Sequence, residues 1–369
     1  MPALAPKTQN IADLIEKAEI KKKAGGKVEF PLKIPEGFYV GIFAKNLSSP
    51  RDLQLTPGGT MLVSVPKNGK VEALPDVDHD GVADQIKTIL SGLDNPHGMA
   101  FYNNQLFVAE ETAVTRYDWD ENNLEATIDK LIVTLPDGGR HTTRTLEFDP
   151  DGRLYVSIGS TCDVCHEIDP WIATVLTTDY DGRNPRVFAK GLRNAVFIKM
   201  QPITNLLWGT EMGRDFLGDN LPSDEINILR EGKDYGWPIC YGNKIHDTSF
   251  DKNQYIVNPC DATENPVFEI AAHSAPLGLA FIDSPIFPTD WQGDLLVSLH
   301  GSWNRSTPVG YKVVRLSVDG EKVSGEEDFL TGFLSGRNAL GRPVDLEFDS
   351  NGYLYISDDK AGVVYIVSR

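Results

Sequence analysis

The sequence predicts an all-β fold, a six-bladed β-propeller, from two observations. A phrase of two apolar strands about a tight turn occurs six times between residues 49 and 358. One basic position recurs within this phrase, and in the first four copies it holds Arg51, His97, Arg144 and Arg193, which lie 46, 47 and 49 residues apart. That period is the length of a four-stranded blade. A sandwich and a β-helix are the competing all-β folds, and the blade-length period favours the propeller.

The first elements come before the repeats. Residues 1–30 are rich in Lys and Ala with weak helical periodicity, so we expect a short helix or a loose lead-in. The segment FPLKIPEGFYVGIFAKNL (residues 30–47) alternates apolar and polar residues, which predicts a pair of strands. Each later copy joins two such apolar stretches through a turn such as PGG, PDG or SNG. Each copy therefore predicts the first two strands of a blade.

Further strands complete the blades. The segments VTRYDW (residues 114–119) and YKVVRLSVDG (residues 311–320) follow the second and fifth copies and predict outer strands. The last segment, AGVVYIVSR (residues 361–369), needs a partner to close the ring, and GFYVGIF (residues 37–43) is the natural one. We therefore expect residues 31–369 to form a single propeller domain.

The repeats carry a functional clue in their basic position. In the fifth and sixth copies this position holds Leu277 and Val344, with His273 and Arg342 just upstream. Equivalent positions in a closed ring lie on one face around one axis, so we expect a cationic collar at one mouth of the channel. On a chain of net charge -18, such a collar points to an anionic ligand. The insertion at residues 215–275 predicts substrate-side loops, because extra residues in a repeat map to the binding face.

Composition excludes some partners and suggests a compartment. The net charge disfavours nucleic acid as a partner. No long apolar run and no N-terminal apolar core occur, so we expect neither a membrane span nor a signal peptide in this chain. Cys162, Cys165, Cys240 and Cys260 fit two disulfides in an oxidising compartment, periplasmic or extracellular. Reduced thiols are the alternative, and zinc lacks a second pair of ligands.

Seven segments in order resemble a known family. They are HTTRTLEFDPDGRLYVSIGSTCDVC, GLRNAV, GRDFLGDNLPSDEIN, YGWPICYG, HSAPLGLAF, HGSWNRSTPVGYKVVRL and GRPVDLEFDSNGYLYISDD. Together they are similar to the soluble quinoprotein sugar dehydrogenases that use pyrroloquinoline quinone (PQQ), particularly the sorbosone dehydrogenase-like branch, over nearly everything after Pro35. The resemblance implies a six-bladed propeller that binds PQQ and Ca²⁺ at the mouth of its channel. The three carboxylates of PQQ agree with the cationic collar.

The resemblance implies a role for His141, which precedes the third copy in GGRHTTRTLEF. This residue matches the family's catalytic base. Removing a hydroxyl proton near neutral pH suits histidine, which is the side chain that titrates there. The alternative is a structural histidine that caps a turn.

The resemblance also implies cofactor contacts. Arg193 and Asn194, in GLRNAV, match residues that contact PQQ, and the planar fork of an arginine suits a carboxylate. An Arg193 stacked between blades or paired with Asp215 is the alternative. Arg342 and Arg305 are further candidates for the carboxylates, and Trp303 for stacking on the cofactor or the substrate. Arg144 and His97 join the cofactor-binding candidates through their places in the collar.

Two segments are candidates for calcium. The family supplies two successive backbone carbonyls to the calcium ion that touches PQQ, and these match Gly213 and Arg214. Glucose-oxidising relatives have Gly-Pro there, so it is open whether Asp215 or Asp219 joins the ligands.

The segment DVDHDGVAD carries Asp76, Asp78, Asp80 and Asp84 around Gly81. It lacks the bidentate Glu at position twelve of an EF-hand, so we expect a shorter, structural calcium loop; an ion-free acidic turn is the alternative.

The expected activity is PQQ- and calcium-dependent oxidation of a sugar: an aldose, a sorbosone-like aldehyde or a polyol. Hydride would pass to the quinone with His141 as general base, and electrons would leave to an external acceptor such as a cytochrome. A calcium-dependent lactonase-like hydrolase and a non-catalytic binding propeller are the alternatives. The sequence contains no signature of serine hydrolases, P-loop enzymes, zincins or Rossmann domains.

Overall fold

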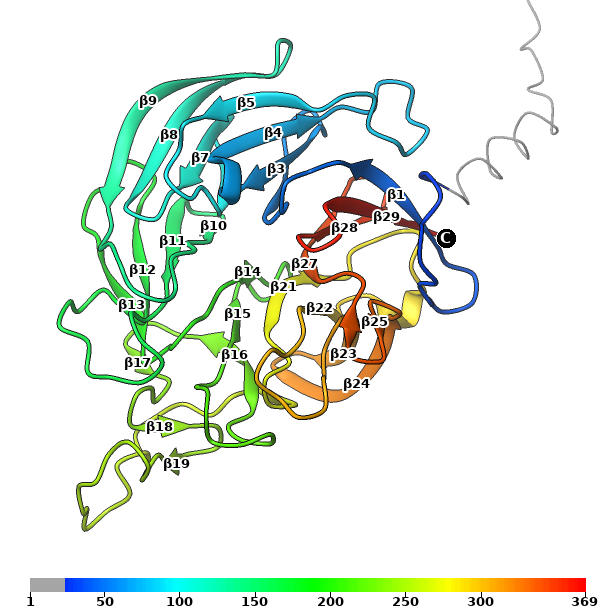
Figure 1. The fold of residues 1–369 in the computed structure, drawn as a ribbon. Coiled ribbons are helices and arrows are strands. Elements are labelled where there is room, and N and C mark those ends of the chain that lie inside the picture. Colours follow the sequence, from blue (N-terminus) through cyan, green and yellow to red (C-terminus); the bar gives the residue numbers. More distant parts are fainter. Residues whose placement is uncertain (1–23) are drawn as a thin grey trace, which may run out of the picture.

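Six sheets, each built on four antiparallel strands, are arranged in a ring in this computed structural model, which describes residues 24–369 (Figure 1). The first two sheets, from the axis outward, are β2 (Leu53–Leu55), β3 (Met61–Val65), β4 (Lys70–Leu74), β5 (Lys87–Ser91), and β6 (Met99–Tyr102), β7 (Gln105–Ala109), β8 (Ala113–Asp120), β9 (Glu125–Thr134). The third is β10 (Leu146–Phe148), β11 (Arg153–Ile158), β12 (Thr174–Asp179), β13 (Arg186–Lys190), extended by the parallel β17 (Lys233–Asp234).

The other three sheets complete the circle. They are β14 (Ile198–Met200), β15 (Leu207–Glu211), β16 (Asp224–Leu229), β20 (Phe268–Ile270); β21 (Pro276–Phe281), β22 (Leu295–Leu299), β23 (Lys312–Asp319), β24 (Lys322–Leu330); and β27 (Pro343–Phe348), β28 (Leu354–Asp358), β29 (Val363–Ser368), β1 (Tyr39–Lys45). Two small hairpins, β18 (Cys240–Tyr241) with β19 (Ile245–His246) and β25 (Leu334–Ser335) with β26 (Asn338–Ala339), and two 3₁₀ turns, η1 (Pro66–Asn68) and η2 (Thr289–Trp291), lie in the connections.

The ring closes between the two ends of the described chain. Strand β1 pairs antiparallel with β29, from Tyr39 opposite Ser368 to Lys45 opposite Val363, so the predicted closure is confirmed. The predicted strand pair at residues 30–47 is wrong in part: only β1 is a strand, and Lys33 makes an isolated bridge with Thr331. The expected helix at the N-terminus falls at residues 1–23, outside the described part.

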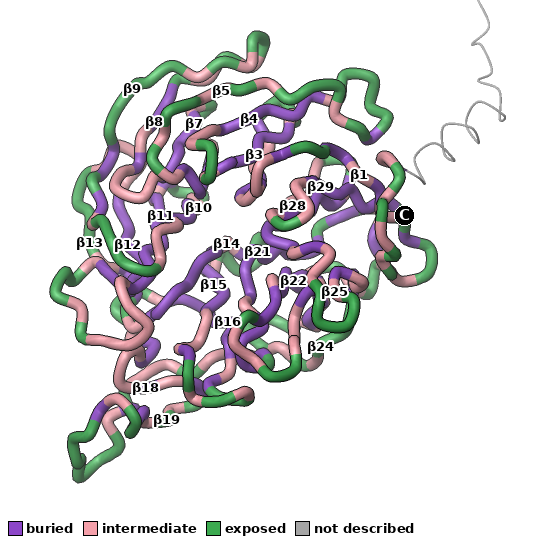
Figure 2. Tube along the Cα trace, viewed as in Figure 1, coloured by how far each residue is buried: buried purple, intermediate pink, exposed green. Residues whose placement is uncertain are grey.

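The core lies between neighbouring sheets, because the middle strands of a blade are covered on both faces. All five residues of β3 and all six of β16 are buried, and β15 and β22 are likewise buried throughout and purple in Figure 2. Trp208 of β15 packs edge-on against Phe281 of β21, with ring centroids 5.4 Å apart. This burial on both faces explains why the second strand of each copy, such as MLVSV or LLVSL, is largely apolar.

The innermost strands are held in register by short links between adjacent blades. Asp52 accepts a hydrogen bond from the backbone N–H of Met99 (2.9 Å), and Asp345 accepts one from that of Leu53 (2.8 Å). A Cβ on Gly98 would lie 2.6 Å from the carbonyl oxygen of Arg144, so a glycine is required where these strands approach. These links between blades hold the loops before and after the innermost strands in place around the axis.

Candidate active site

A cavity of about 220 Å³ lies between loops of the third, fourth and fifth sheets. Its walls are Arg140, His141, Arg193, Asn194, Met212, Gly213, Asp215, Asp224, His273, Ala275, Trp303 and Asn304. Five residues predicted from the sequence, His141, Arg193, Asn194, Gly213 and Trp303, therefore come together here. The wall also includes both ends of the insertion at residues 215–275, as expected for substrate-side loops.

His141 lies just ahead of β10 and its hydrogen bonds define its tautomer. Its Nδ1 is 2.9 Å from the carbonyl oxygen of Ser160 and 3.0 Å from the Ser160 hydroxyl. A carbonyl oxygen only accepts, so Nδ1 carries the proton and Nε2 carries the lone pair. Nε2 has no hydrogen-bond partner within residues 24–369. Burial, reinforced by the charge of Arg193, lowers the pKa of His141 to about 3, so the ring is neutral near pH 7.

Arg193 is buried in the wall of the same cavity and donates four hydrogen bonds. Its Nη2 donates to Asp163 Oδ1 (2.9 Å) and Asp215 Oδ2 (3.2 Å), its Nε to the Asp163 carbonyl (3.0 Å), and its Nη1 to the Met212 carbonyl (3.3 Å). The side chain is 5% exposed. The pairing of Arg193 with Asp215, which the sequence left as an alternative, is therefore present in the wall of the cavity.

Asp215 gathers three partners from different loops. Besides Arg193, Arg140 Nη2 donates to Oδ2 (2.9 Å) and Asn304 Nδ2 donates to Oδ1 (2.5 Å). The Oδ1 of Asn304 is buried and has no partner in the described part of the chain. Arg140 and Asn304 each lie one position from a predicted site residue, and adjacency in those motifs was the only signal in the sequence that could have found them.

Of the two residues predicted to offer calcium ligands, Gly213 lines the cavity and Arg214 does not. Asp224, which is buried, accepts from the backbone N–H groups of Gly213 (2.9 Å) and Ala275 (2.8 Å), and burial raises its pKa to about 7. The Arg214 side chain donates to Asp247 (2.6 Å) and Ser249 (3.1 Å). Among residues 24–369 no hydrogen bond reaches the carbonyl oxygens of Gly213 and Arg214, so both remain available as ligands.

The collar is not a ring of free cations. His97 and Arg144 are almost completely buried and neither lines the cavity. Arg144 donates to the carbonyl oxygens of Pro136, His141 and Thr143, so this guanidinium supports the loop that carries His141. Arg51 pairs with Asp359 at 2.9 Å. The geometry thus gives no support to His97 and Arg144 as cofactor contacts in this cavity, because backbone and blade packing cover both.

Arg342 and Arg305 also lie outside the cavity wall. Arg342 donates to the Gly301 carbonyl (3.2 Å) and the Tyr311 hydroxyl (3.1 Å) and contacts His300 Nδ1 (3.2 Å). Arg305, next to Asn304, donates to the Ala272 carbonyl (3.0 Å) and Asn220 (2.9 Å). Asp219 accepts from Ser306 and does not line the cavity.

The acidic loop of DVDHDGVAD borders a different cavity, of about 340 Å³, between the first and sixth sheets. Carboxylate oxygens of Asp76, Asp78 and Asp84 lie within 4.8 Å of one another. Asp80 accepts from the N–H of Val82 (2.8 Å), and its own N–H is bonded to Asp76 (3.2 Å). The spacing of these oxygens suits one cation, and the loop shares no residue with the His141 cavity.

The four cysteines form the two predicted disulfides, Cys162–Cys165 and Cys240–Cys260. Over residues 24–369 no helix is long and apolar enough to cross a bilayer.

Comparison with known proteins adds independent evidence. A family model described as TrAA12-like matches residues 32–369. An uncharacterized protein from Borreliella burgdorferi is 30% identical over 93% of this chain and 92% of that protein. A pyrroloquinoline quinone-dependent pyranose dehydrogenase from Coprinopsis cinerea is 24% identical over 92% of this chain, which spans only 55% of the length of that enzyme.

A solved structure matches the fold. The holo form of the PQQ domain of the Coprinopsis cinerea pyranose dehydrogenase superposes with a TM-score of 0.82 at 21% identity, covering 94% of this chain and 100% of that domain. This similarity shows that the chain has the same fold as that domain.

Proposed function

Because the chain belongs to the TrAA12-like family of quinoprotein sugar dehydrogenases, we propose that it oxidises a sugar with PQQ bound in the His141 cavity. The observation that carries this proposal is the geometry of His141: a neutral, oriented imidazole whose Nε2 is unpartnered and lies in the wall of a polar cavity. An aldose, a sorbosone-like aldehyde hydrate and a polyol all offer the hydroxyl proton that such a base removes.

The donor set of the cavity fits the cofactor and its calcium ion. Within residues 24–369 the side-chain amide of Asn194 makes only a weak 3.6 Å contact to Met212 Sδ, so this amide is available to an oxygen-rich ligand. The unbonded carbonyls of Gly213 and Arg214 suit Ca²⁺, which prefers oxygen ligands. A Cβ on residue 213 would lie 2.7 Å from Pro222, so the glycine permits this close approach. These groups would hold PQQ and Ca²⁺, with Arg193 as a buried cation in the same cavity wall.

The residues divide the chemistry between them. PQQ, when bound, supplies a two-electron acceptor, and Ca²⁺ supplies a Lewis acid. His141 Nε2 accepts the hydroxyl proton of the substrate while Ser160 holds Nδ1–H, so the ring keeps one tautomer and one orientation. Burial and the charge of Arg193 keep the imidazole unprotonated near pH 7, so its Nε2 lone pair is available to accept a proton.

Trp303 and Asn304 are placed to position the substrate. Trp303 is 63% exposed at the rim and presents an apolar ring face on which a sugar can stack. The buried Oδ1 of Asn304 lacks a donor, and a sugar hydroxyl would supply one. Arg342 and Arg305 remain proposed contacts only for the outer parts of a larger ligand, since both lie outside the cavity wall.

A second calcium ion is proposed at Asp76, Asp78, Asp80 and Asp84, where it would brace the outer connection of the first blade. We also propose that the chain works in a periplasmic or extracellular compartment, which would keep both disulfides oxidised. Electrons would then pass to an external acceptor such as a cytochrome.

The proposed function is tested by reconstitution. Metal-depleted protein is titrated with PQQ in the presence and absence of Ca²⁺, and dye reduction is then followed with a panel of aldoses, polyols and aldehydes. We expect calcium-dependent PQQ binding and turnover with at least one sugar. His141→Ala should retain PQQ and lose turnover. Absence of PQQ binding at micromolar cofactor, together with hydrolysis of a lactone panel, would favour the hydrolase alternative instead.

A further inference from the structure

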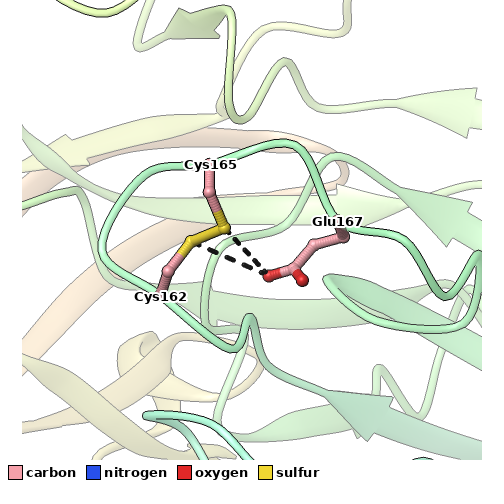
Figure 3. A group of neighbouring side chains, drawn as sticks. All are labelled: Cys162, Cys165 and Glu167. Carbon is pink, nitrogen blue, oxygen red and sulfur yellow. Dashed lines mark hydrogen bonds between the residues drawn. A yellow bond between two sulfur atoms is a disulfide. The ribbon is translucent and has the colours of Figure 1, made fainter.

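A loop closed by a disulfide lies beside the His141 cavity. It follows β11, and the bond joins Cys162 to Cys165, three residues apart. Figure 3 shows the carboxylate of Glu167 facing the two sulfurs, at 3.9 Å from Cys162 Sγ and 3.7 Å from Cys165 Sγ. The same carboxylate accepts from the backbone N–H of Thr161 (2.7 Å) and from its hydroxyl. The loop is thus closed by the disulfide and also by the hydrogen bonds between Glu167 and Thr161.

The loop contacts the guanidinium of Arg193 through Asp163. Its carbonyl oxygen accepts from Arg193 Nε (3.0 Å) and from Trp237 Nε1 (3.2 Å), and its Oδ1 accepts from Arg193 Nη2 (2.9 Å). The Oδ1 also accepts from the backbone N–H of Asp215 (2.8 Å). Asp163 lies between the two cysteines, so the disulfide restricts the backbone that presents both oxygens to the guanidinium.

The loop contacts His141 through Ser160. The Ser160 hydroxyl donates to the Cys162 carbonyl (2.6 Å), and this fixes the hydroxyl beside His141 Nδ1 at 3.0 Å. The backbone N–H of Ser160 donates to the Arg193 carbonyl (2.7 Å), and that of Arg140 donates to the Thr161 carbonyl (2.9 Å). One short loop therefore contacts the imidazole of His141, the guanidinium of Arg193 and the backbone of Arg140.

We propose that the Cys162–Cys165 loop is a positioning element for the site, and that Asp163 is its positioning residue for Arg193. Opening the disulfide lowers cofactor affinity and turnover together. In that step a dithiol reductant supplies two electrons and two protons, the S–S bond breaks to give two thiols, and the reductant becomes a disulfide. Both cysteines are partly exposed, so a small reductant reaches them. The part of this proposal that concerns PQQ rests on the proposed function.

The second disulfide supplies a matched control. Cys240–Cys260 closes a longer loop, with a sequence separation of 20, and neither cysteine lines the His141 cavity. In the simplest chain-entropy account, a longer loop stabilises the folded state more. Loss of Cys240–Cys260 should therefore lower the melting temperature at least as much as loss of Cys162–Cys165, while leaving the cavity unchanged.

The experiment compares C162S/C165S, C240S/C260S and Asp163→Asn with the wild type. The readouts are the ring ¹⁵N shifts of His141 without cofactor, the Kd for PQQ in the presence of Ca²⁺, and kcat against KM for the sugar. We expect C162S/C165S to shift the His141 resonance and to raise the Kd for PQQ at least tenfold. Asp163→Asn should raise the Kd for PQQ and leave the ring ¹⁵N shifts of His141 unchanged. The control variant C240S/C260S should change neither the His141 shifts nor the Kd for PQQ.

Two outcomes overturn the proposal: unchanged His141 shifts and PQQ affinity in folded C162S/C165S, or equal changes in the control. If C162S/C165S fails to fold, dithiothreitol added to C240S/C260S opens the single remaining disulfide, and the same readouts apply. Failure of wild-type protein to bind PQQ would refute the proposed function instead. The His141 resonance of the cofactor-free protein would still decide whether the loop positions that ring.

Discussion

The protonation of His141 offers the sharpest quantitative test of the site. Burial and the charge of Arg193 lower the pKa of His141 to about 3, against 6.5 for an ordinary histidine. Between these values the unfolded chain binds a proton on this ring and the folded chain does not. Stability therefore rises with pH across that window and is lost as the pH falls. Above pH 6.5 the ring is neutral in both states and has no effect.

The size of this effect follows from the two values. At pH 5 the unfolded form is mostly protonated and the folded form mostly neutral, so the linkage costs about 2 kcal/mol relative to pH 7.5. Many carboxylates titrate in the same range, so the comparison needs a control that removes only this ring. His141→Gln serves, because its amide can donate to the Ser160 carbonyl and does not titrate.

The assay is urea denaturation of cofactor-free protein at pH 7.5 and pH 5. The wild type should lose about 2 kcal/mol more than His141→Gln between these conditions. Ring resonances of His141 should show no protonation above pH 4. A resonance that titrates near 6.5, or equal losses in the two proteins, would refute the inference that His141 is a buried neutral base.

Three further predictions follow from the same contacts. Arg193→Lys cannot reproduce the fork that reaches Asp163 and Asp215, and the loss of a charged hydrogen bond, about 1.5–3 kcal/mol, should appear as a lower urea midpoint and weaker PQQ binding. Asp224→Asn keeps an acceptor for only one of its two backbone N–H groups, so its unfolding free energy should fall by about 1–3 kcal/mol; an unchanged melting temperature would contradict this. Calcium should raise the melting temperature of cofactor-free protein through the acidic loop, and Asp76→Asn should reduce that rise; equal rises in the two proteins would remove this ion site.

The sequence predicted the ring because the period of the repeats and the alternation within them are local. Each phrase forms two neighbouring strands joined by a turn of a few residues, and the number of phrases equals the number of blades. Closure by β1 and β29 was also predictable, since both ends of the chain read as strands and the last blade needs a further strand to complete the ring. The segment at residues 30–34 was mistaken for a strand because an alternating pattern does not show whether a partner exists.

The candidate site was predictable only in part. His141, Arg193, Asn194, Gly213 and Trp303 were found through the family motifs and do share one cavity. The repeat position alone gave a wrong indication for His97 and Arg144, which do not line the cavity. Equivalent positions in the ring fix where the backbone of a residue lies, but not the direction of its side chain. The three carbonyl oxygens bonded by Arg144 belong to the loop just ahead of β10, and the spacing of the repeats does not show that this loop folds over the guanidinium.

By itself, then, the sequence determined the blade count, the closure and the cysteine pairs, since these depend on patterns within short segments. The tertiary structure alone decided the electrostatics. Asp163 and Asp215, 52 residues apart in the chain, neutralise Arg193 where the sequence indicated a free collar of cations. Charges pair by distance in space, and only the folded ring brings the CxxC loop of the third blade against the loop that follows β15.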